Sequence, residues 1–288
     1  MPHRLSAVWR AKLQGISLLL LAALLALPAT AQMGGFGRKG MGGERPAGMQ
    51  DNSSVSSDGV ERLEHEITAT GLSVAFPTEF ECAPIASPFA SPDRFDGSTR
   101  RGDRNSGLHG GMDLSLKEGT PLLAISSGEV IARGEGGRLE GIYLWLRHAP
   151  ADTGLPFWVF IKYQHLAALP VPNVGDRVQV GQVIGLSGNT GTTGGAFGAA
   201  GYPHLHLSAF YGPRSEYIKK GMFNSMVQGQ GAALDDPLIL YLQGVSDLKQ
   251  VRNVSNEHRQ ISIAVVGEDG AVYPTGSKSV WPVRCKRK

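Results

Sequence analysis

The sequence predicts an all-β protein, an antiparallel β-sandwich or open barrel with irregular N- and C-terminal extensions. From Met112 onward, short runs rich in Val, Ile, Leu and aromatic residues are separated by turns that contain glycine. No long stretch of this region has the 3.6-residue apolar period of an amphipathic helix. Short strands at such close spacing, joined by glycine turns, are typical of sandwiches and barrels.

The first 31 residues predict a secretory signal peptide. Three basic residues precede an apolar run from Ile16 to Leu27, and Ala29-Thr30-Ala31 then provides a cleavage site with small side chains. An uncleaved membrane anchor is the alternative, but the apolar run is shorter than the ~20 residues that a spanning helix needs. We therefore expect cleavage after Ala31, export to the periplasm or the medium, and no stable membrane insertion of the mature chain.

The charge balance gives no sign of a nucleic-acid partner. The full chain has 28 basic and 25 acidic residues, and its predicted signal peptide holds three basic residues and no acidic one. The mature chain would then carry 25 of each kind and be formally neutral. The basic excess of the whole sequence is therefore not the footprint of a nucleic-acid-binding surface.

Residues 32–71 predict a flexible leader. Gly, Met and Ser are frequent at its start, and no periodic apolar pattern there is available for burial. Within the leader, Val60 to Ile67 fits either a short amphipathic helix or a strand. Three prolines between residues 84 and 92 then interrupt an irregular stretch. We expect folded structure to begin near Leu72.

The main domain is predicted to cover residues 72–241 and to consist of strands joined by turns. Residues 149–155 are expected to form a hairpin connection. The glycine-rich loop from Gly188 to Gly201 lacks the glycine order and the lysine of a phosphate-binding loop; it predicts a wall of a substrate groove or a plain surface turn. The predicted strands are Pro121 to Ile125, Glu129 to Arg133, Ile142 to Arg147, Trp158 to His165, Val174 to Val178 and Gly181 to Gly185.

Residues 242–288 are predicted to form a C-terminal β-extension. Before it, Phe210 to Gly231 shows no regular pattern, and Asp236 to Tyr241 fits a short helix or strand. Gln260 to Val266 and Ala271 to Tyr273, separated by a turn with two glycines, predict a β-hairpin. We expect these strands to join the main sheet.

Cys82 and Cys285 stand near the two ends of the predicted folded region and are the two cysteines of the chain. In an exported protein an even cysteine count favours a disulfide, and the absence of C-x-x-C argues against a zinc site. Two separate thiols are the alternative. A bond between them would close a loop around nearly the whole domain and add on the order of a few kcal/mol of stability.

The stretch from Tyr202 to Leu207 contains the pattern His-x-His. On a strand, His204 and His206 point to the same side, because successive side chains alternate between the two faces. Upstream, His109 and Asp113 offer an imidazole and a carboxylate, and His165 offers a further imidazole. Zinc sites of hydrolytic enzymes are assembled from such groups on separate segments.

At these residues the sequence resembles the zinc endopeptidases of the LytM and lysostaphin type, the M23 peptidases. The resemblance extends from about Ser87 to Pro237 and implies the β-fold of LytM, the duplicated hybrid motif. Its motifs are H-x-x-x-D from His109, G-T-P-L-L-A from Gly119, S-G-E-V from Ser127, Y-Q-H-L from Tyr163, V-G-D-x-V-x-x-G-Q-V-I-G from Val174, G-N-T-G from Gly188 and P-H-L-H from Pro203.

The resemblance implies that His109, Asp113 and His206 bind Zn²⁺ and that His165 and His204 are catalytic. The residue chemistry agrees, since two neutral imidazoles and one carboxylate leave the ion net positive, with a position open for water or a substrate carbonyl. The residues themselves do not divide the proton-transfer roles between His165 and His204.

Three further residues are interpreted separately from the five site residues. His148 is interpreted as structural, although related sequences often carry a histidine there. Arg94 resembles an arginine that often precedes the first motif of the family, but an insertion separates it from His109. Asn105 is a candidate for filling the open zinc position in an inhibited state.

The sequence therefore predicts an exported zinc endopeptidase whose substrate is the cross-linked peptide of bacterial peptidoglycan, with D-alanyl–diaminopimelate bonds favoured over glycine bridges. A non-catalytic LytM-type regulator of cell-wall amidases is the alternative, but such regulators have lost zinc ligands. A lipoyl- or biotinyl-type carrier is a third possibility. It would need a lysine at a hairpin tip, where this chain has Glu135 and Gly136.

Overall fold

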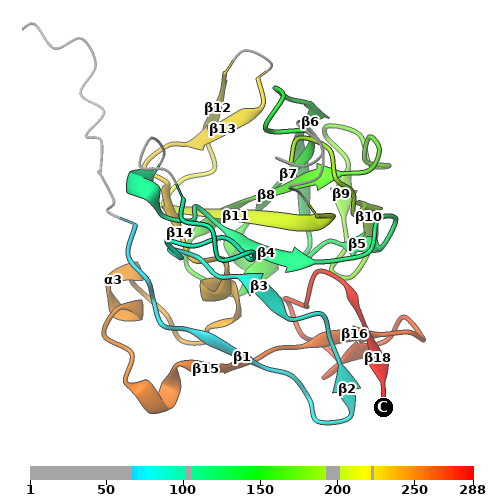
Figure 1. Cartoon of the computed structure of the whole chain (residues 1–288). Coiled ribbons are helices and arrows are strands. Elements are labelled where there is room, and N and C mark those ends of the chain that lie inside the picture. The colour runs from blue at the N-terminus through cyan, green and yellow to red at the C-terminus, as the bar shows by residue number, and fades with distance from the viewer. Residues whose placement is uncertain (1–66, 101–104, 193–201, 222–223) are drawn as a thin grey trace, which may run out of the picture. The chain divides into compact units, whose positions relative to one another are not determined.

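A computed structural model describes residues 67–100, 105–192, 202–221 and 224–288, which all belong to one compact unit (Figure 1). The predicted signal peptide, residues 32–66 of the predicted leader and residues 193–201 of the glycine-rich loop lie outside the described residues. The first strand, β1 (Ser73–Ala75), begins close to the predicted start of the fold. Within the described ranges, no helix has the length and apolarity that crossing a membrane requires.

An eight-stranded antiparallel sheet forms the main part of the molecule, and it confirms the all-β prediction. The strand order is β3-β4-β11-β8-β7-β6-β9, and β14 pairs with β11 beside β4. The strands are β3 (Ile85–Ser87), β4 (Met112–Ser115), β6 (Gly128–Glu135), β7 (Ile142–His148), β8 (Trp158–Leu166), β9 (Arg177–Val178), β11 (His204–Gly212) and β14 (Ala233–Asp235).

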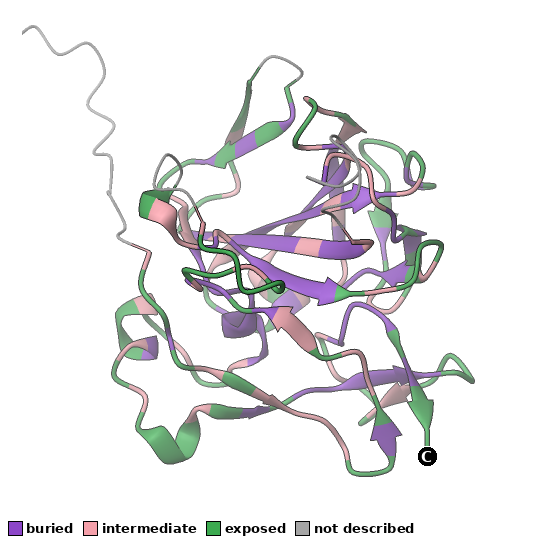
Figure 2. Cartoon of the chain, viewed as in Figure 1, coloured by how far each residue is buried: buried purple, intermediate pink, exposed green. Residues whose placement is uncertain are grey.

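The central strands β7 and β8 are apolar on both faces, because both faces of the sheet are covered. Leu144 and Ile161 belong to the larger core cluster, whereas Trp145 and Phe160, one residue along each strand, belong to a second cluster. This assignment follows from the two-residue period of a strand. Figure 2 shows these central strands as mainly buried.

A second layer covers the larger core. It contains the strand pair β5 (Pro121–Leu123) and β10 (Val183–Leu186), together with the 3-10 helix η2 (Pro237–Tyr241). The buried hydroxyl of Tyr163 on β8 ties the layers together, since it accepts from the Ile125 amide at 2.9 Å and donates to the Leu123 carbonyl at 3.2 Å.

The C-terminal extension forms a sheet of its own, so the prediction that it joins the main sheet was wrong. The order is β17-β16-β18-β2, with β2 (Phe80–Glu81), β16 (Val265–Gly267), β17 (Val272–Tyr273) and β18 (Arg284–Arg287). The chain ends pair because β2 lies antiparallel to β18, and a Cys82–Cys285 disulfide joins them. The predicted hairpin is present as β16 and β17, whereas β15 (Gln260–Ser262) pairs in parallel with β1.

Three stretches expected to be irregular contain regular elements. Residues 210–231 hold the end of β11 and a hairpin of β12 (Tyr217–Lys220) and β13 (Met226–Gly229). Most of β12 is exposed, so its sequence lacks the apolar alternation that predicts a strand. The connection after β7 contains the short helix α1 (Pro150–Thr153), and β3 lies in the proline-interrupted stretch. The other helical turns are η1 (Asn105–Gly107), α3 (Leu248–Val251) and η3 (Asn256–His258).

Candidate active site

Strand pairing brings three ligand-type side chains together at one end of β4 and β11. His206 on β11 is the register partner of Asp113 on β4, and His109 lies in the loop four residues before Asp113. Gly111 allows this loop to pass close to β11: a Cβ there would lie 2.2 Å from the Leu207 carbonyl oxygen and 2.8 Å from His206 Nε2. Any other residue at this position would therefore displace the loop or the histidine.

The ligand-type atoms of these residues form a small triangle. His206 Nδ1 lies 2.8 Å from Asp113 Oδ1 and 3.1 Å from His109 Nε2, and His109 Nε2 lies 3.3 Å from Asp113 Oδ1. Ligands at 2.0–2.1 Å around a tetrahedral zinc ion are separated by roughly 3.3 Å. A divalent metal thus fits this donor set with small shifts of the side chains, and all three residues are nine-tenths buried or nearly so.

In His109 and His206, the ring nitrogen that points away from the triangle makes a hydrogen bond within the protein. His109 Nδ1 donates to the Pro88 carbonyl at 2.9 Å and has Ser87 Oγ at 3.3 Å. His206 Nε2 lies 2.9 Å from Ser208 Oγ. Such bonds select the ring tautomer and leave the inward nitrogen, His109 Nε2 or His206 Nδ1, free to accept a metal.

The surroundings of His206 and Asp113 give these two groups the protonation states that metal binding requires. Burial lowers the pKa of His206 to about 4, against the opposing effect of Asp113, so the ring is neutral at neutral pH. For Asp113, burial alone would raise the pKa, but its contacts with His109 and His206 outweigh this effect, and the pKa lies well below its usual range. A neutral His206 imidazole and an ionised Asp113 carboxylate therefore face the centre of the triangle.

The two predicted catalytic histidines border this triangle. The His165 ring centroid lies 4.6 Å from that of His204 and 6.1 Å from that of His206, and His204 Nε2 is 3.8 Å from Asp113 Oδ1. In each case Nδ1 faces a backbone carbonyl, that of Thr190 at 2.8 Å or that of Tyr202 at 2.9 Å. Because those Nδ1 atoms donate, Nε2 is the basic nitrogen of each ring.

His165 reaches the site through an irregular backbone. In the pairing of β7 with β8, Tyr143 faces Gln164 and Ile142 faces Leu166, so His165 is the extra residue of a bulge. Its φ of 65° lies in the left-handed region, which costs a residue with a Cβ roughly 1 kcal/mol or more. Bulges re-aim side chains beside active sites, and this one turns the imidazole toward His204.

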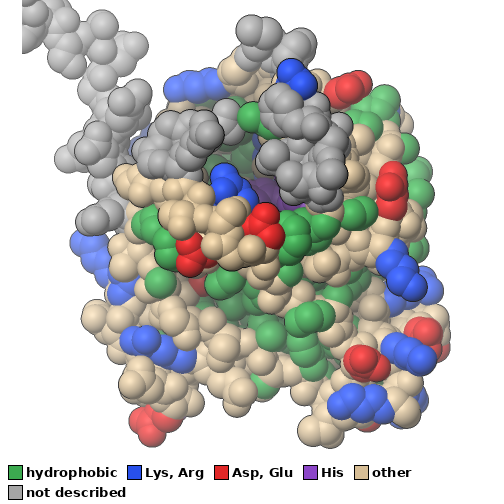
Figure 3. Space-filling view, viewed as in Figure 1, with side chains coloured by type: hydrophobic (Ala, Val, Ile, Leu, Met, Phe, Trp, Pro, Cys, Tyr) green, Lys and Arg blue, Asp and Glu red, His purple; other side chains and the backbone are tan. Residues whose placement is uncertain are grey.

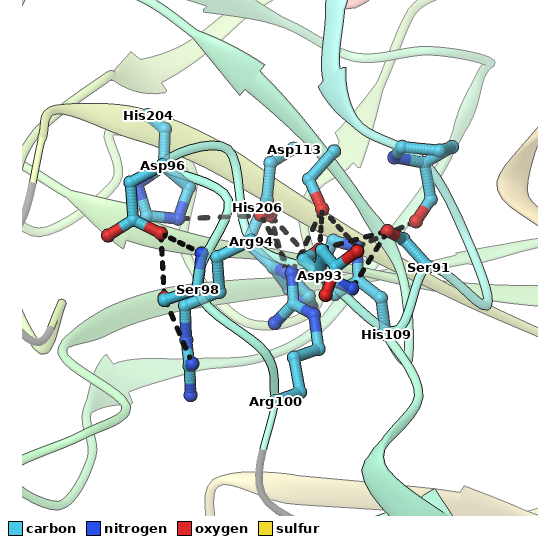
Figure 4. Close-up of polar contacts among 12 residues, drawn as sticks. Ser91, Asp93, Arg94, Asp96, Ser98, Arg100, His109, Asp113, His204 and His206 are labelled. Carbon is cyan, nitrogen blue, oxygen red and sulfur yellow. Dashed lines mark hydrogen bonds and ion pairs between the residues drawn. The ribbon is translucent and has the colours of Figure 1, made fainter.

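Two residues beside the site had no predicted role. The Arg100 guanidinium donates from Nη2 to Ser87 Oγ at 2.9 Å and lies 3.7 Å from Asp113 Oδ2 (Figure 4). The Tyr202 ring stacks on that of His204, with centroids 4.6 Å apart. Arg100 was missed because a hairpin with an Asp93–Thr99 bridge carries it back to the site, and no sequence period reports such a return.

Arg94, His148 and Asn105 are not part of the ligand triangle. Arg94, on the same hairpin, is partly exposed, and its guanidinium donates to the Thr99 carbonyl at 2.8 Å. His148 is fully buried, with Nδ1 donating to the Ser127 carbonyl at 2.7 Å; burial lowers its pKa to about 4. Asn105 is exposed and lies against Gly110. Figure 3 shows histidine surface in a hollow bordered by basic and acidic side chains.

Residues 107–217 match the model of a family described as Peptidase family M23. The chain is 32% identical over 146 residues to an uncharacterized metalloprotease of Buchnera aphidicola subsp. Baizongia pistaciae, which covers 51% of this chain and 33% of the relative.

Other relatives have a named activity, among them the following two. Lysostaphin of Staphylococcus simulans is 38% identical over 103 residues, or 36% of this chain and 18% of lysostaphin. The peptidoglycan DD-endopeptidase ShyC of Vibrio cholerae is 34% identical over 98 residues, or 34% of this chain and 19% of ShyC. The solved catalytic domain of lysostaphin matches 55% of this chain and 92% of that domain, at 25% identity and a TM-score of 0.36. The chain thus spans about a third or less of the length of these three relatives.

Proposed function

Because residues 107–217 make the chain a member of peptidase family M23, we propose that it is an exported, zinc-dependent endopeptidase that hydrolyses peptide cross-links of bacterial peptidoglycan. The observation that carries this proposal is the convergence of five side chains. His109, Asp113 and His206 form a triangle with the donors and spacing that zinc requires, and the rings of His165 and His204 lie beside it.

The relatives support the substrate class. Lysostaphin is a peptidase, and ShyC is named a peptidoglycan DD-endopeptidase. The similarity to each covers about a third of this chain. The predicted signal peptide and the Cys82–Cys285 disulfide support export to an oxidising compartment.

The proposed chemistry divides between the metal and the chain. When bound at His109, Asp113 and His206, Zn²⁺ supplies Lewis acidity that polarises an amide carbonyl and acidifies water. Burial of the site excludes competing solvent and strengthens every electrostatic interaction within it. The bonds from His109 to Pro88 and from His206 to Ser208 keep the two rings oriented for this task.

Proton transfer is assigned to His165 and His204. Each ring has Nδ1 bonded to a backbone carbonyl, so Nε2 is free to take a proton from the attacking water and to return one to the departing amine. Burial and the neighbouring histidines lower the pKa of His165 to about 3. At neutral pH the His165 ring is therefore neutral, and its Nε2 can accept a proton from the attacking water.

The alternative of a non-catalytic regulator is not favoured. Regulators of this type have lost zinc ligands, whereas the three ligand-type residues of this chain are all present and adjacent. The presence of these ligands, and not the fold alone, favours a catalytic function.

The test uses the predicted mature chain, residues 32–288, loaded with zinc and incubated with purified peptidoglycan. We expect muropeptides to be released, with mass spectra that identify the cleaved bond. Treatment with a chelator, or His206→Ala, should abolish release, whereas His258→Ala, an exposed histidine on η3, should not. A His206→Ala chain as active as the wild type would overturn the proposal.

A further inference from the structure

Arg100 holds an unused hydrogen-bonding capacity beside the candidate active site. Its side chain is 19% exposed. Among the described residues, its guanidinium makes one hydrogen bond, from Nη2 to Ser87 Oγ. The buried Nε has no partner there. The separation of 3.7 Å from Asp113 Oδ2 is too long for a hydrogen bond. A buried charged donor without a partner is costly and calls for a ligand.

Tyr202 supplies a second such donor. Its hydroxyl is buried and, within the described part of the chain, makes no hydrogen bond. The ring is fixed by stacking on His204, and the phenol and the Arg100 guanidinium are close enough to interact electrostatically. Two donors without a partner among the described residues thus border the site: the Tyr202 hydroxyl, on a ring that stacks on His204, and the Arg100 guanidinium, near the outer oxygen of Asp113.

The charge of this region favours an anion. With zinc bound, the ion contributes two positive charges, Asp113 one negative charge and Arg100 one positive charge. The surplus of two positive charges attracts an anionic group of the substrate. A guanidinium matches the planar, two-oxygen geometry of a carboxylate better than any other anion-binding side chain.

Peptide geometry decides which carboxylate can reach Arg100. The α-carboxylate of the residue on the amine side of the scissile amide is three bonds from the scissile carbonyl carbon, a separation of roughly 3–4 Å. Arg100 Nη2 lies 3.7 Å from one oxygen of Asp113, and the other oxygen belongs to the ligand triangle. One residue of substrate can therefore place its amide at the triangle and its carboxylate at Arg100.

We propose that Arg100, assisted by the Tyr202 hydroxyl, binds the free α-carboxylate of the residue on the amine side of the scissile amide. This rests on the proposed function and narrows its substrate class. A D-alanyl–diaminopimelate cross-link and a terminal D-alanyl–D-alanine both carry that carboxylate, whereas the internal residues of a glycine bridge do not. Arg100 thus selects the first two over the third.

The first experiment compares two substrates that differ in one group: an acylated D-alanyl–D-alanine peptide and the same peptide with a C-terminal amide. The zinc-loaded wild type should cleave the acid with a kcat/KM about 10- to 100-fold higher, the range expected for a hydrogen bond to a charged group. Arg100→Gln should bring the ratio close to one by slowing cleavage of the acid, and Tyr202→Phe should lower it less. Arg94→Gln is the matched control on the same hairpin and should keep the wild-type ratio.

The second experiment measures binding without turnover. In zinc-loaded His165→Ala, calorimetry should show the acid binding about 10- to 100-fold more tightly than the amide, and Arg100→Gln should remove this preference. If the acid is preferred but the wild type hydrolyses nothing, the carboxylate site stands and the proposed function fails. If peptidoglycan is digested but the acid and the amide are treated alike, the carboxylate site is wrong and the proposed function stands. An equal loss for both substrates in Arg100→Gln, together with lost zinc, would also overturn it, because Arg100 would then merely support Asp113.

Discussion

The candidate active site and the C-terminal extension both bury polar groups, but they do so in different ways. Around β8 and β11 the chain holds a buried carboxylate, a histidine with strained backbone at His165, and donors at Arg100 and Tyr202 that have no partner among the described residues. In the extension, Trp281 is fully buried and its indole N–H donates to the Ala83 carbonyl at 3.0 Å. The Cys82–Cys285 disulfide closes that sheet.

The difference shows where stability and chemistry are located. Unpaired donors and a left-handed histidine lower the stability of the free protein, and they persist where a ligand or a reaction uses them. The extension pairs the two ends of the folded region and has few groups that could take part in a reaction. We therefore expect changes at the site to affect activity more than folding, and changes in the extension to do the reverse.

The largest effect is expected at His165, where two variants separate the effect on activity from the effect on stability. His165→Ala and His165→Gly should each lower kcat/KM by about 10²–10⁴-fold, since both remove a group that transfers protons. Glycine adopts φ of 65° without strain, so the Gly variant should be about 1 kcal/mol more stable than the Ala variant despite its smaller side chain. Activity assays and urea unfolding measure the two effects. A more stable Ala variant would show that the bulge is not strained.

Removal of the disulfide should have the opposite result, a large loss of stability with little loss of activity. The double variant Cys82→Ser with Cys285→Ser should lose about 3–5 kcal/mol of unfolding free energy, because the bond closes a loop across a sequence separation of 203 residues. Below its melting temperature, the variant should retain kcat/KM within about twofold, since the bond lies in the sheet of β2 and β18. Thermal unfolding and peptide hydrolysis at 20 °C provide the two readouts. A large loss of activity in the folded variant would mean that the extension shapes the site.

The same division explains what could be predicted from the sequence. The central strands of the main sheet were predictable because they are short apolar runs, such as Ile142 to Leu146 and Trp158 to Ile161, separated by turns. The sequence was also sufficient to propose the five site side chains, since each lies in a short motif on or beside a strand. The pairing of β2 with β18 was not predictable, because both strands are short and lie about 200 residues apart.

The position of Arg100 and the bulge at His165 escaped prediction for a related reason. Both depend on backbone geometry that a side-chain pattern does not encode. Arg94 has a better match to a family position, yet the hairpin carries Arg100, and not Arg94, to Asp113. An insertion before His109 breaks the correspondence that a motif comparison relies on, and only the fold shows which arginine lies near Asp113.

The smallest effect is expected at Asp236, where a change should alter the pH dependence of the unfolding free energy. This residue begins η2, accepts from the Leu238 amide and from the Thr70 hydroxyl, and burial raises its pKa to about 6 even though these bonds oppose the shift. The folded state therefore binds the proton more tightly than the unfolded state. The contribution to stability is complete below about pH 4 and is lost as the pH rises through about 6.

Asp236→Asn removes this titration while keeping an oxygen that can accept from Leu238. Between pH 4 and pH 7, the unfolding free energy of the wild type should therefore fall relative to that of the variant by on the order of 2–3 kcal/mol. Urea unfolding of both proteins at half-unit pH steps measures the difference directly. If the difference stays constant across that range, Asp236 is ionised in the folded protein at pH 4. Asp236 would then be a buried charge, as Asp113 is at the candidate active site.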